Sequence, residues 1–367
     1  MLTDVKVLDL TRVLAGPLAT MMLGDMGASV LKVERPGGGD ETRGWGPPFD
    51  GRGESAYYLS VNRNKLGITA DLDQAPDVAL LRALAATADV VVENFRPGTL
   101  ERRGLGAAAL RAEHPSLVWC TISGFGPQSP RPGYDFVVQA ESGWMSITGE
   151  ATGTPMKHGI ALADVLAGKD AALAIVGALV ARARTGHGCH VQVSLEASAE
   201  AALLNVAQNA LVSGEPPSRW GNAHANLVPY QLFESADRPL VIAVGNDAQW
   251  LACATALGLD ALADEPALRT NAGRLRDRER VVREIARRVR SRSASDWLEH
   301  LNMAGVPCGV VRSVLEVLGA AHGSSLTGMP PSVPGTVRLP PPRLGEHSAL
   351  VRARGWSAFT SESVTPV

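Results

Sequence analysis

Aromatic residues and cysteines are scarce in this sequence. Aromatic side chains make up 5% of its 367 residues, too few to suggest a surface on which nucleic-acid bases would stack. No cysteine lies close to another in the chain, so we interpret all of them as reduced residues of a cytoplasmic protein. They are Cys120, Cys189, Cys253 and Cys308.

The sequence also lacks an excess of charge and a long hydrophobic run. Its formal net charge is −2, which gives no electrostatic reason to expect nucleic acid or an anionic membrane as a partner. The longest apolar run, residues 171–181, is too short to span a bilayer and predicts a buried helix. Residues 1–4 lead directly into a strand-like segment, so we expect no signal peptide.

We expect no metal site. His187, Cys189 and His190 lie close together, as zinc ligands can. Zinc sites usually draw on two separated pairs of ligands, however, and the sequence shows no second pair with suitable spacing. The glycines at 186 and 188 instead predict a turn between a helix and a strand.

The first half of the chain alternates short apolar runs with helical patterns. Continuous apolar strands separated by helices are typical of a parallel sheet covered on both faces. We therefore predict an α/β fold whose large domain, residues 1–225, holds a doubly wound, Rossmann-like parallel sheet. The expected strands are residues 5–10, 29–33, 90–93, 117–123 and 190–195, and the expected helices include residues 17–26, 80–87 and 196–211.

The pattern changes near residue 229. Residues 230–233 and 240–244 predict two antiparallel strands, and helical segments follow them. We expect these elements to form a smaller α/β domain, residues 226–328. The last segment, residues 329–367, is rich in proline and glycine and should run extended across the surface.

A single carboxylate, Asp164, precedes the long apolar helical run that ends in basic residues and glycine. We interpret Asp164 as the N-cap of that helix, where unpaired N–H groups and the helix dipole should keep it ionised. A fixed, ionised carboxylate can act as a nucleophile toward an activated acyl group. From these residues alone, a purely structural capping role is the favoured interpretation.

Two loops offer candidate ligand contacts. Residues 36–44, PGGGDETRG, follow a strand and combine glycines with the nearby Arg35 and Arg43, which could bind a phosphate. The loop matches neither a Walker nor a Rossmann fingerprint and could be an ordinary loop. Asn94 and Phe95 begin the sequence NFRPG at the carboxyl end of an expected strand, where the alternative is a simple turn.

Several blocks of the sequence resemble, in the same order, the class III CoA-transferases, the family of formyl-CoA transferase and carnitine-CoA transferase. Agreement in many separate blocks is far more specific than any one short pattern. The blocks are VKVLDLTRVLAGPLATMMLGDMGASVLKVERPGGGDETRGWGPP (5–48), SVNRNK (60–65), DVVVENFRPGTLERRGLG (89–106), GYDFVVQAESGWMSITG (133–149), TGHGCHVQVSLEAS (185–198), RWGNAHANLVPYQLF (219–233), GVPCGVV (305–311) and PPPRLGEH (340–347).

The resemblance implies roles for individual residues. Asp164 matches the family's nucleophile. The resemblance also implies that a coenzyme A thioester binds as substrate, with no permanently bound cofactor and no metal. The implied CoA contacts are Arg35, Arg43, Asn94, Phe95 and Arg102. It further implies an interlocked homodimer, in which the C-terminal segment returns to the large domain.

The implied reaction is CoA transfer from an acyl-CoA to a carboxylic acid through an aspartyl-CoA thioester. Two blocks are most similar to the succinyl-CoA:glutarate branch, which implies a short dicarboxylic acceptor and a succinyl-CoA-like donor. The acceptor-site candidates are Arg12, Tyr134, Arg219 and His224. Two alternatives stay open: an acyl-CoA racemase, which would carry histidine where this chain has Tyr134, and a non-catalytic CoA-thioester-binding protein.

Overall fold

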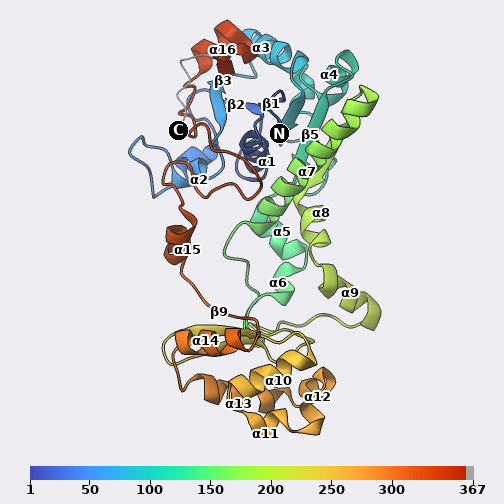
Figure 1. Ribbon diagram of the computed structural model, residues 1–367. Coiled ribbons are helices and arrows are strands. Elements are labelled where there is room, and N and C mark those ends of the chain that lie inside the picture. The colour runs from blue at the N-terminus through green and yellow to red at the C-terminus, as the bar shows by residue number, and fades with distance from the viewer. Residues whose placement is uncertain (361–367) are drawn as a thin grey trace. The chain divides into compact units, whose positions relative to one another are not determined.

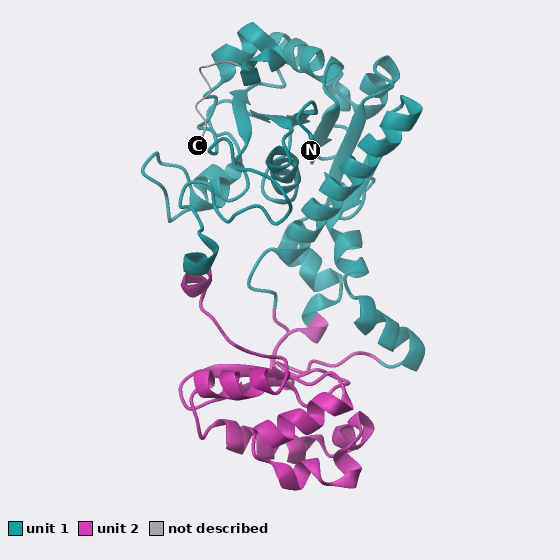
Figure 2. Ribbon diagram, in the orientation of Figure 1, with its two compact units in different colours: residues 1–145, 157–215, 318–367 teal, residues 146–156, 216–317 magenta. Residues whose placement is uncertain are grey.

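The computed structural model describes residues 1–360 and divides the chain into two compact units (Figure 2). The large unit comprises residues 1–145, 157–215 and the chain from 318 onward, and the small unit comprises residues 146–156 and 216–317. Both boundaries come earlier in the chain than the expected 226 and 329. Residues 146–156 belong to the small unit, although the sequence gives no sign that the chain leaves the large unit there.

The large unit is built on a six-stranded sheet in the order β3-β2-β1-β4-β5-β6, with every pair parallel (Figure 1). This confirms the predicted doubly wound α/β fold. The strands are β1 (Lys6–Asp9), β2 (Ser29–Glu34), β3 (Lys65–Thr69), β4 (Val90–Glu93), β5 (Val118–Ser123) and β6 (His190–Ser194). β3 was not predicted from the sequence, because it begins with a lysine and has no continuous apolar run.

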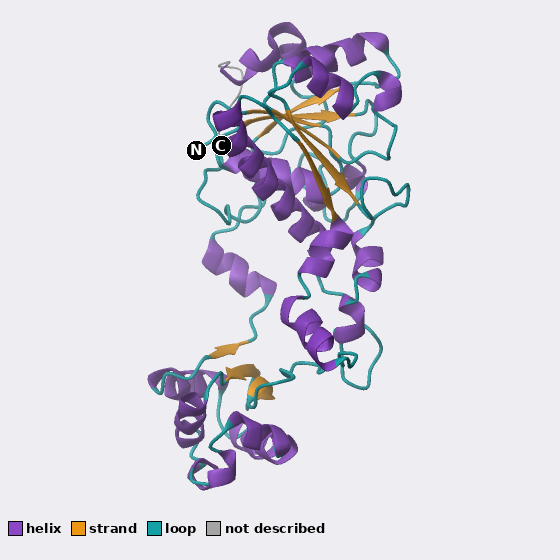
Figure 3. Ribbon diagram, turned by 90° about the vertical axis from the view of Figure 1, so that its right-hand side faces the viewer, coloured by secondary structure: helices purple, strands orange, loops and turns teal. Residues whose placement is uncertain are grey.

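Helices cover both faces of this sheet (Figure 3). Alternate strand residues enter different cores: Val7 packs with the long helix α7 (Leu162–Thr185), and Leu8 packs with the helices on the opposite face. The first face carries α1 (Ala15–Asp25) and α7, and the second carries α3 (Ala75–Ala86), α4 (Ala107–Glu113) and α16 (Ser348–Arg354).

The other helices of the large unit are short. The expected helix 196–211 is two helices, α8 (Leu195–Ala201) and α9 (Leu204–Ser213), because Leu204 adopts a left-handed backbone conformation with φ of 37°. The rest are α2 (Ala56–Leu59), α5 (Asp135–Glu141), the boundary helix α6 (Trp144–Ile147) and the 3-10 turns η1 (Glu41–Gly44), η2 (Glu101–Arg103) and η4 (Gly355–Thr360).

The C-terminal segment packs on β3, the edge strand of the sheet. Gly67 donates its N–H to Nδ1 of His347 at 3.1 Å and accepts the His347 N–H at 2.9 Å, so the exposed edge of β3 is satisfied. This segment is not wholly extended as expected, since it contains α16, whose Val351 enters the core. Residues 361–367 of the expected segment 329–367 lie outside the described part of the chain.

The small unit has an antiparallel sheet in the order β7-β8-β9, with the two predicted strands as β7 and β8. Its core is formed by buried side chains that include Trp250 and Trp297. The elements are β7 (Tyr230–Glu234), β8 (Pro239–Ala243), β9 (Cys308–Val310), α10 (Asp247–Ala256), α11 (Asp260–Ala263), η3 (Pro266–Leu268), α12 (Asn271–Arg276), α13 (Arg278–Val289), α14 (Ala294–Met303) and the boundary helix α15 (Val314–Ala321). Among residues 1–360, no helix is both long and apolar enough to cross a bilayer.

Candidate active site

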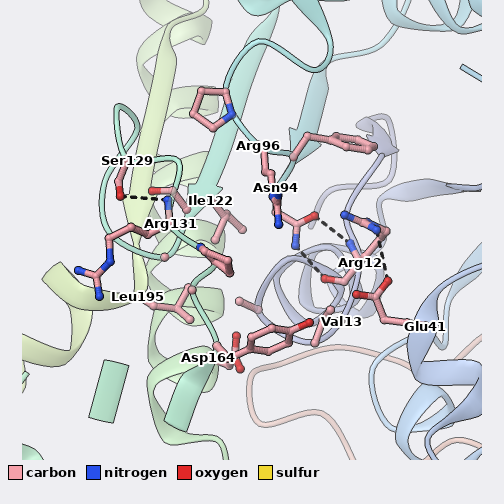
Figure 4. Close-up of a pocket in the computed structure, with 18 residues that line it drawn as sticks. Arg12, Val13, Glu41, Asn94, Arg96, Ile122, Ser129, Arg131, Asp164 and Leu195 are labelled. Atoms are coloured by element: carbon pink, nitrogen blue, oxygen red, sulfur yellow. Dashed lines mark hydrogen bonds and ion pairs between the residues drawn. The ribbon is translucent and has the colours of Figure 1, made fainter. Parts of the chain in front are cut away.

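A pocket of about 320 Å³ lies at the carboxyl edge of the six-stranded sheet, where the strand order reverses between β1 and β4. Parallel α/β sheets leave a crevice at such a point, because the loops after the two strands run to opposite sides. The 18 residues that line the pocket come mainly from the loops after β1, β4 and β5 and from the start of α7 (Figure 4).

Asp164 lines this pocket from the first turn of α7. It is the third residue of the helix, and Ala161 is the N-cap, so the prediction that Asp164 caps the helix was wrong. The backbone N–H of Ala15, the first residue of α1, lies close enough to its carboxylate to favour the ionised form. The two helices can approach this closely because Gly168 has no side chain: a Cβ there would lie 2.6 Å from the carbonyl oxygen of Ala15.

The pKa of Asp164 is raised to about 7, first by burial and then by the nearby carboxylate of Asp135. The nearby N–H of Ala15 lowers the pKa without offsetting these two effects. The expectation that Asp164 stays fully ionised was therefore wrong, because burial outweighs the helix terminus. Near neutral pH the ionised form is populated but poorly solvated, which favours nucleophilic attack. Tyr57 stays protonated beside it, since burial and the charge of Asp164 raise its pKa to about 12.

Asp135, the first residue of α5, holds the turn that carries Asp164. Its Oδ1 accepts the N–H of Ala163 at 2.8 Å, and its Oδ2 accepts Nε2 of Gln139 at 2.6 Å. Gln139 is fully buried and its Oε1 accepts the N–H of His158 at 2.8 Å. The segment before α7 is thus fixed from one face of α5. Sequence reasoning gave Gln139 no role, although its i, i+4 spacing from Asp135 was an available signal.

Asn94 and Phe95 both line the pocket. The carboxamide of Asn94 bonds the main chain of Arg12: Oδ1 accepts its N–H at 3.0 Å, and Nδ2 donates to its carbonyl at 2.8 Å. Phe95 also lines a neighbouring pocket of about 280 Å³, together with the exposed Arg35 and with Leu72.

Arg43 lines neither of these two pockets, and its side chain bonds other residues of the large unit. Its guanidinium, 9% exposed, makes a bidentate pair with Glu34 at 2.7 Å and a salt bridge with Glu54 at 2.6 Å. It also lies over the ring of Tyr58, with its Cζ 3.7 Å from the ring centroid. Because these donors are used inside the large unit, we expect Arg43 to shape the glycine-rich loop rather than to contact CoA. Arg102 is exposed and lines a separate hollow of about 400 Å³.

The predicted acceptor residues fall into two groups. Arg12 and Tyr134 line the pocket with Asp164, and Arg12 forms a salt bridge with Glu41 at 3.3 Å. Sequence reasoning did not single out two further cationic lining residues, Arg96 and Arg131. The position of Arg96 within NFRPG, after a strand, was a signal for it.

Arg219 and His224 belong to the small unit. Arg219 donates to three main-chain carbonyls of residues 146–153, at 2.8 to 3.3 Å, and so holds that segment in the small unit. Nδ1 of His224 accepts the N–H of Asn226 at 3.0 Å. Among residues 1–360, no group of three or more histidines, cysteines, aspartates or glutamates is arranged to hold a metal ion.

Known proteins are similar to this chain over most of its length. The sequence model described as CoA-transferase family III matches residues 2–348. The succinate–glutarate CoA-transferase of Agrobacterium fabrum is 41% identical, over 96% of this chain and 95% of that protein. The succinyl-CoA:glutarate CoA-transferase of Mus musculus is 42% identical, over 95% and 84%. A solved CAIB/BAIF family protein from Brucella suis superposes with a TM-score of 0.83 at 39% identity, over 95% and 98%.

Proposed function

Because this chain belongs to CoA-transferase family III, we propose that it transfers coenzyme A from an acyl-CoA thioester to a free carboxylic acid, with Asp164 as the nucleophile. The observation that carries this proposal is a partly buried carboxylate with a raised pKa, lining a pocket at the carboxyl edge of the sheet. Perturbed carboxylates in such clefts are candidates for covalent catalysis.

The proposed reaction has two covalent stages. The Asp164 carboxylate attacks the donor thioester carbonyl, which forms a mixed anhydride and releases the CoA thiolate. The thiolate then attacks the aspartyl carbonyl, which releases the donor acid and leaves an aspartyl-CoA thioester. The acceptor carboxylate repeats these steps in reverse, so the thioester energy is conserved. The N–H of Ala15 lies close to the carboxylate, where it can stabilise the negative charge that develops on the aspartyl oxygen.

The covalent intermediate gives the direct test. Incubation with an acyl-CoA should add the mass of CoA to the protein, and hydroxylamine should remove it. The Asp164→Asn variant, which keeps an oxygen acceptor for the Ala15 N–H, should form no adduct and show no turnover. Near-wild-type turnover by this variant would contradict the nucleophile assignment. Binding without any adduct would favour a non-catalytic CoA-binding protein, and deuterium exchange at the α-carbon would favour a racemase.

We propose a short dicarboxylic acid as the acceptor and a succinyl-CoA-like thioester as the donor, because relatives at 41% and 42% identity are named for succinate and glutarate. A second carboxylate needs a cationic partner when it leaves water. Arg12 supports this role because it lines the pocket with Asp164, and its single salt bridge to Glu41 leaves donors available.

The Arg12→Leu variant tests the acceptor site. It should raise KM at least tenfold for glutarate and much less for pentanoate, which has the same chain length and one carboxylate. Equal effects on both acids would remove Arg12 from the acceptor site. If no dicarboxylate served as acceptor in a broad screen, the acceptor class would be wrong while CoA transfer itself stood.

We also propose that the protein is an interlocked homodimer that acts in the cytoplasm. Helix α9 supports a second chain that covers it. Three of its apolar side chains, Leu204, Leu211 and Val212, are 73%, 79% and 79% exposed within the single chain. The free cysteines are consistent with a reducing compartment. Analytical ultracentrifugation should show a dimer that persists on dilution, and a monomer at micromolar concentration would contradict the interlock.

A further inference from the structure

The main chain between β1 and α1 is held by side chains from two other parts of the large unit. Asn94, directly after β4, bonds both the N–H and the carbonyl of Arg12, at 3.0 and 2.8 Å. The carboxylate of Asp40 accepts the N–H of Val13, at 3.2 and 3.3 Å to its two oxygens. Three successive polar groups of the backbone, the Arg12 N–H and carbonyl and the Val13 N–H, therefore have side-chain partners.

The buried charge of Asp40 is itself fixed. Lys32 of β2, fully buried, donates from Nζ to the Asp40 carboxylate at 3.1 Å and to the carbonyl of Thr11 at 3.1 Å. The backbone N–H and the hydroxyl of Thr42 complete the environment of Asp40, at 3.0 and 2.8 Å. Neither charge of this pair is exposed to solvent, so their geometry is rigid.

The residue held in this way has a strained backbone. Val13 has a φ of 71°, in the left-handed region. A β-branched residue avoids this region because its Cβ and γ-methyl groups crowd the neighbouring peptides. Such conformations persist only where the surroundings impose them, and they cluster at functional sites. In this chain the surroundings include the two hydrogen bonds between Asn94 and the main chain of Arg12, and the hydrogen bond that Asp40 accepts from the N–H of Val13.

The strained turn leads directly to the nucleophile. Val13 lines the pocket, and two residues later Ala15 lines it too, with its N–H close enough to the Asp164 carboxylate to favour the ionised form. If Val13 relaxed to an ordinary negative φ, the peptides that follow would rotate and the Ala15 N–H would no longer point toward Asp164. The direction of this N–H therefore depends on how residues 12 and 13 are held.

Building on the proposed function, we propose that Asn94 and Asp40 are positioning residues that hold Val13 in its left-handed conformation and thereby direct the Ala15 N–H at Asp164. The resemblance implied that Asn94 contacts CoA. Here its carboxamide oxygen and one amide hydrogen are used by the backbone of Arg12 instead. Asn94 thus acts on the reaction through the backbone and through Ala15.

A double-mutant cycle tests this role, because glycine adopts positive φ freely while alanine does not. The Asn94→Ala substitution should lower kcat at least tenfold when residue 13 is valine, and less than threefold in the Val13→Gly background. In the Val13→Ala background the loss should remain at least tenfold, which separates backbone freedom from side-chain size. The Kd of CoA should change less than threefold throughout. An equal loss in all three backgrounds, or a tenfold rise in Kd at unchanged kcat, would overturn the proposal.

Hydrogen exchange of the unliganded protein gives a readout that does not depend on turnover. A peptide covering residues 11–16 should exchange at least tenfold faster in Asn94→Ala than in wild type, and the Val13→Gly background should remove most of that difference. Unchanged exchange would overturn the positioning role. If the exchange result held while wild type formed no CoA adduct, the proposed function would be wrong. The conclusion that Asn94 and Asp40 hold residues 12 and 13 would remain valid. If Asn94→Ala does not fold, Asn94→Asp replaces it in the cycle, since it keeps the acceptor for the Arg12 N–H and loses the donor.

Discussion

Replacing Asp164 with asparagine is expected to abolish CoA transfer and, at alkaline pH, to make the protein more stable. Burial and the charge of Asp135 raise the pKa of Asp164 from 3.8 to about 7. The folded protein therefore binds the proton more tightly than the unfolded chain does. Asparagine removes the cost of ionising this group in the folded state, and it keeps an acceptor for the Ala15 N–H.

The size and the sign of the effect follow from linkage. A shift of roughly 3 units at 1.36 kcal/mol per unit corresponds to at most about 4 kcal/mol. Because the folded pKa is raised, the contribution of this one group to the stability of wild type is complete below pH 3.8 and is lost as the pH rises toward 7. The free energy of unfolding of Asp164→Asn minus that of wild type should thus increase between these two values and level off above pH 7.

Denaturant unfolding at several pH values between 4.5 and 8.5 measures this difference directly. The control is Asp170→Asn, which removes a carboxylate of the same helix at an exposed position, where solvent screens its charge. We expect a far smaller effect from this control. A variant that is destabilised at pH 8.5, or that differs from wild type by the same amount at every pH, would refute the reasoning about Asp164.

Two further changes test the surroundings of the nucleophile and the implied CoA contacts. Asp135→Asn keeps the acceptor for the N–H of Ala163 and removes the charge that raises the pKa of Asp164, so the acidic limb of kcat/KM against pH should move to lower pH; an unmoved limb would contradict this. Arg43→Ala should lower the free energy of unfolding by about 3 kcal/mol or more, since it leaves buried carboxylates unpaired, with little effect on the Kd of CoA. Arg35→Ala should do the reverse, raising that Kd about tenfold at unchanged stability, and calorimetry compares the two variants.

The features that sequence reasoning predicted well are the local ones. Apolar strands such as β4 and β5 are recognised because their hydrophobic runs are a property of a few adjacent residues. The doubly wound class followed from their alternation with helices, and the family followed from blocks that keep their order. β3 was missed because its first residue, Lys65, is buried by pairing with Asp9 at 3.0 Å, a contact between distant parts of the chain.

For the site, the sequence by itself determined which residues were candidates, and it placed Asp164 near the start of the long helix. Only the tertiary structure decided that α1 meets α7 so that the Ala15 N–H lies near this carboxylate, and that Asp135 lies close to it. Helix-terminus reasoning from sequence predicted an ionised aspartate and was wrong on that point. A pKa depends on burial and on charges that the fold brings together from separate strands and helices, and no local pattern of residues records either of them.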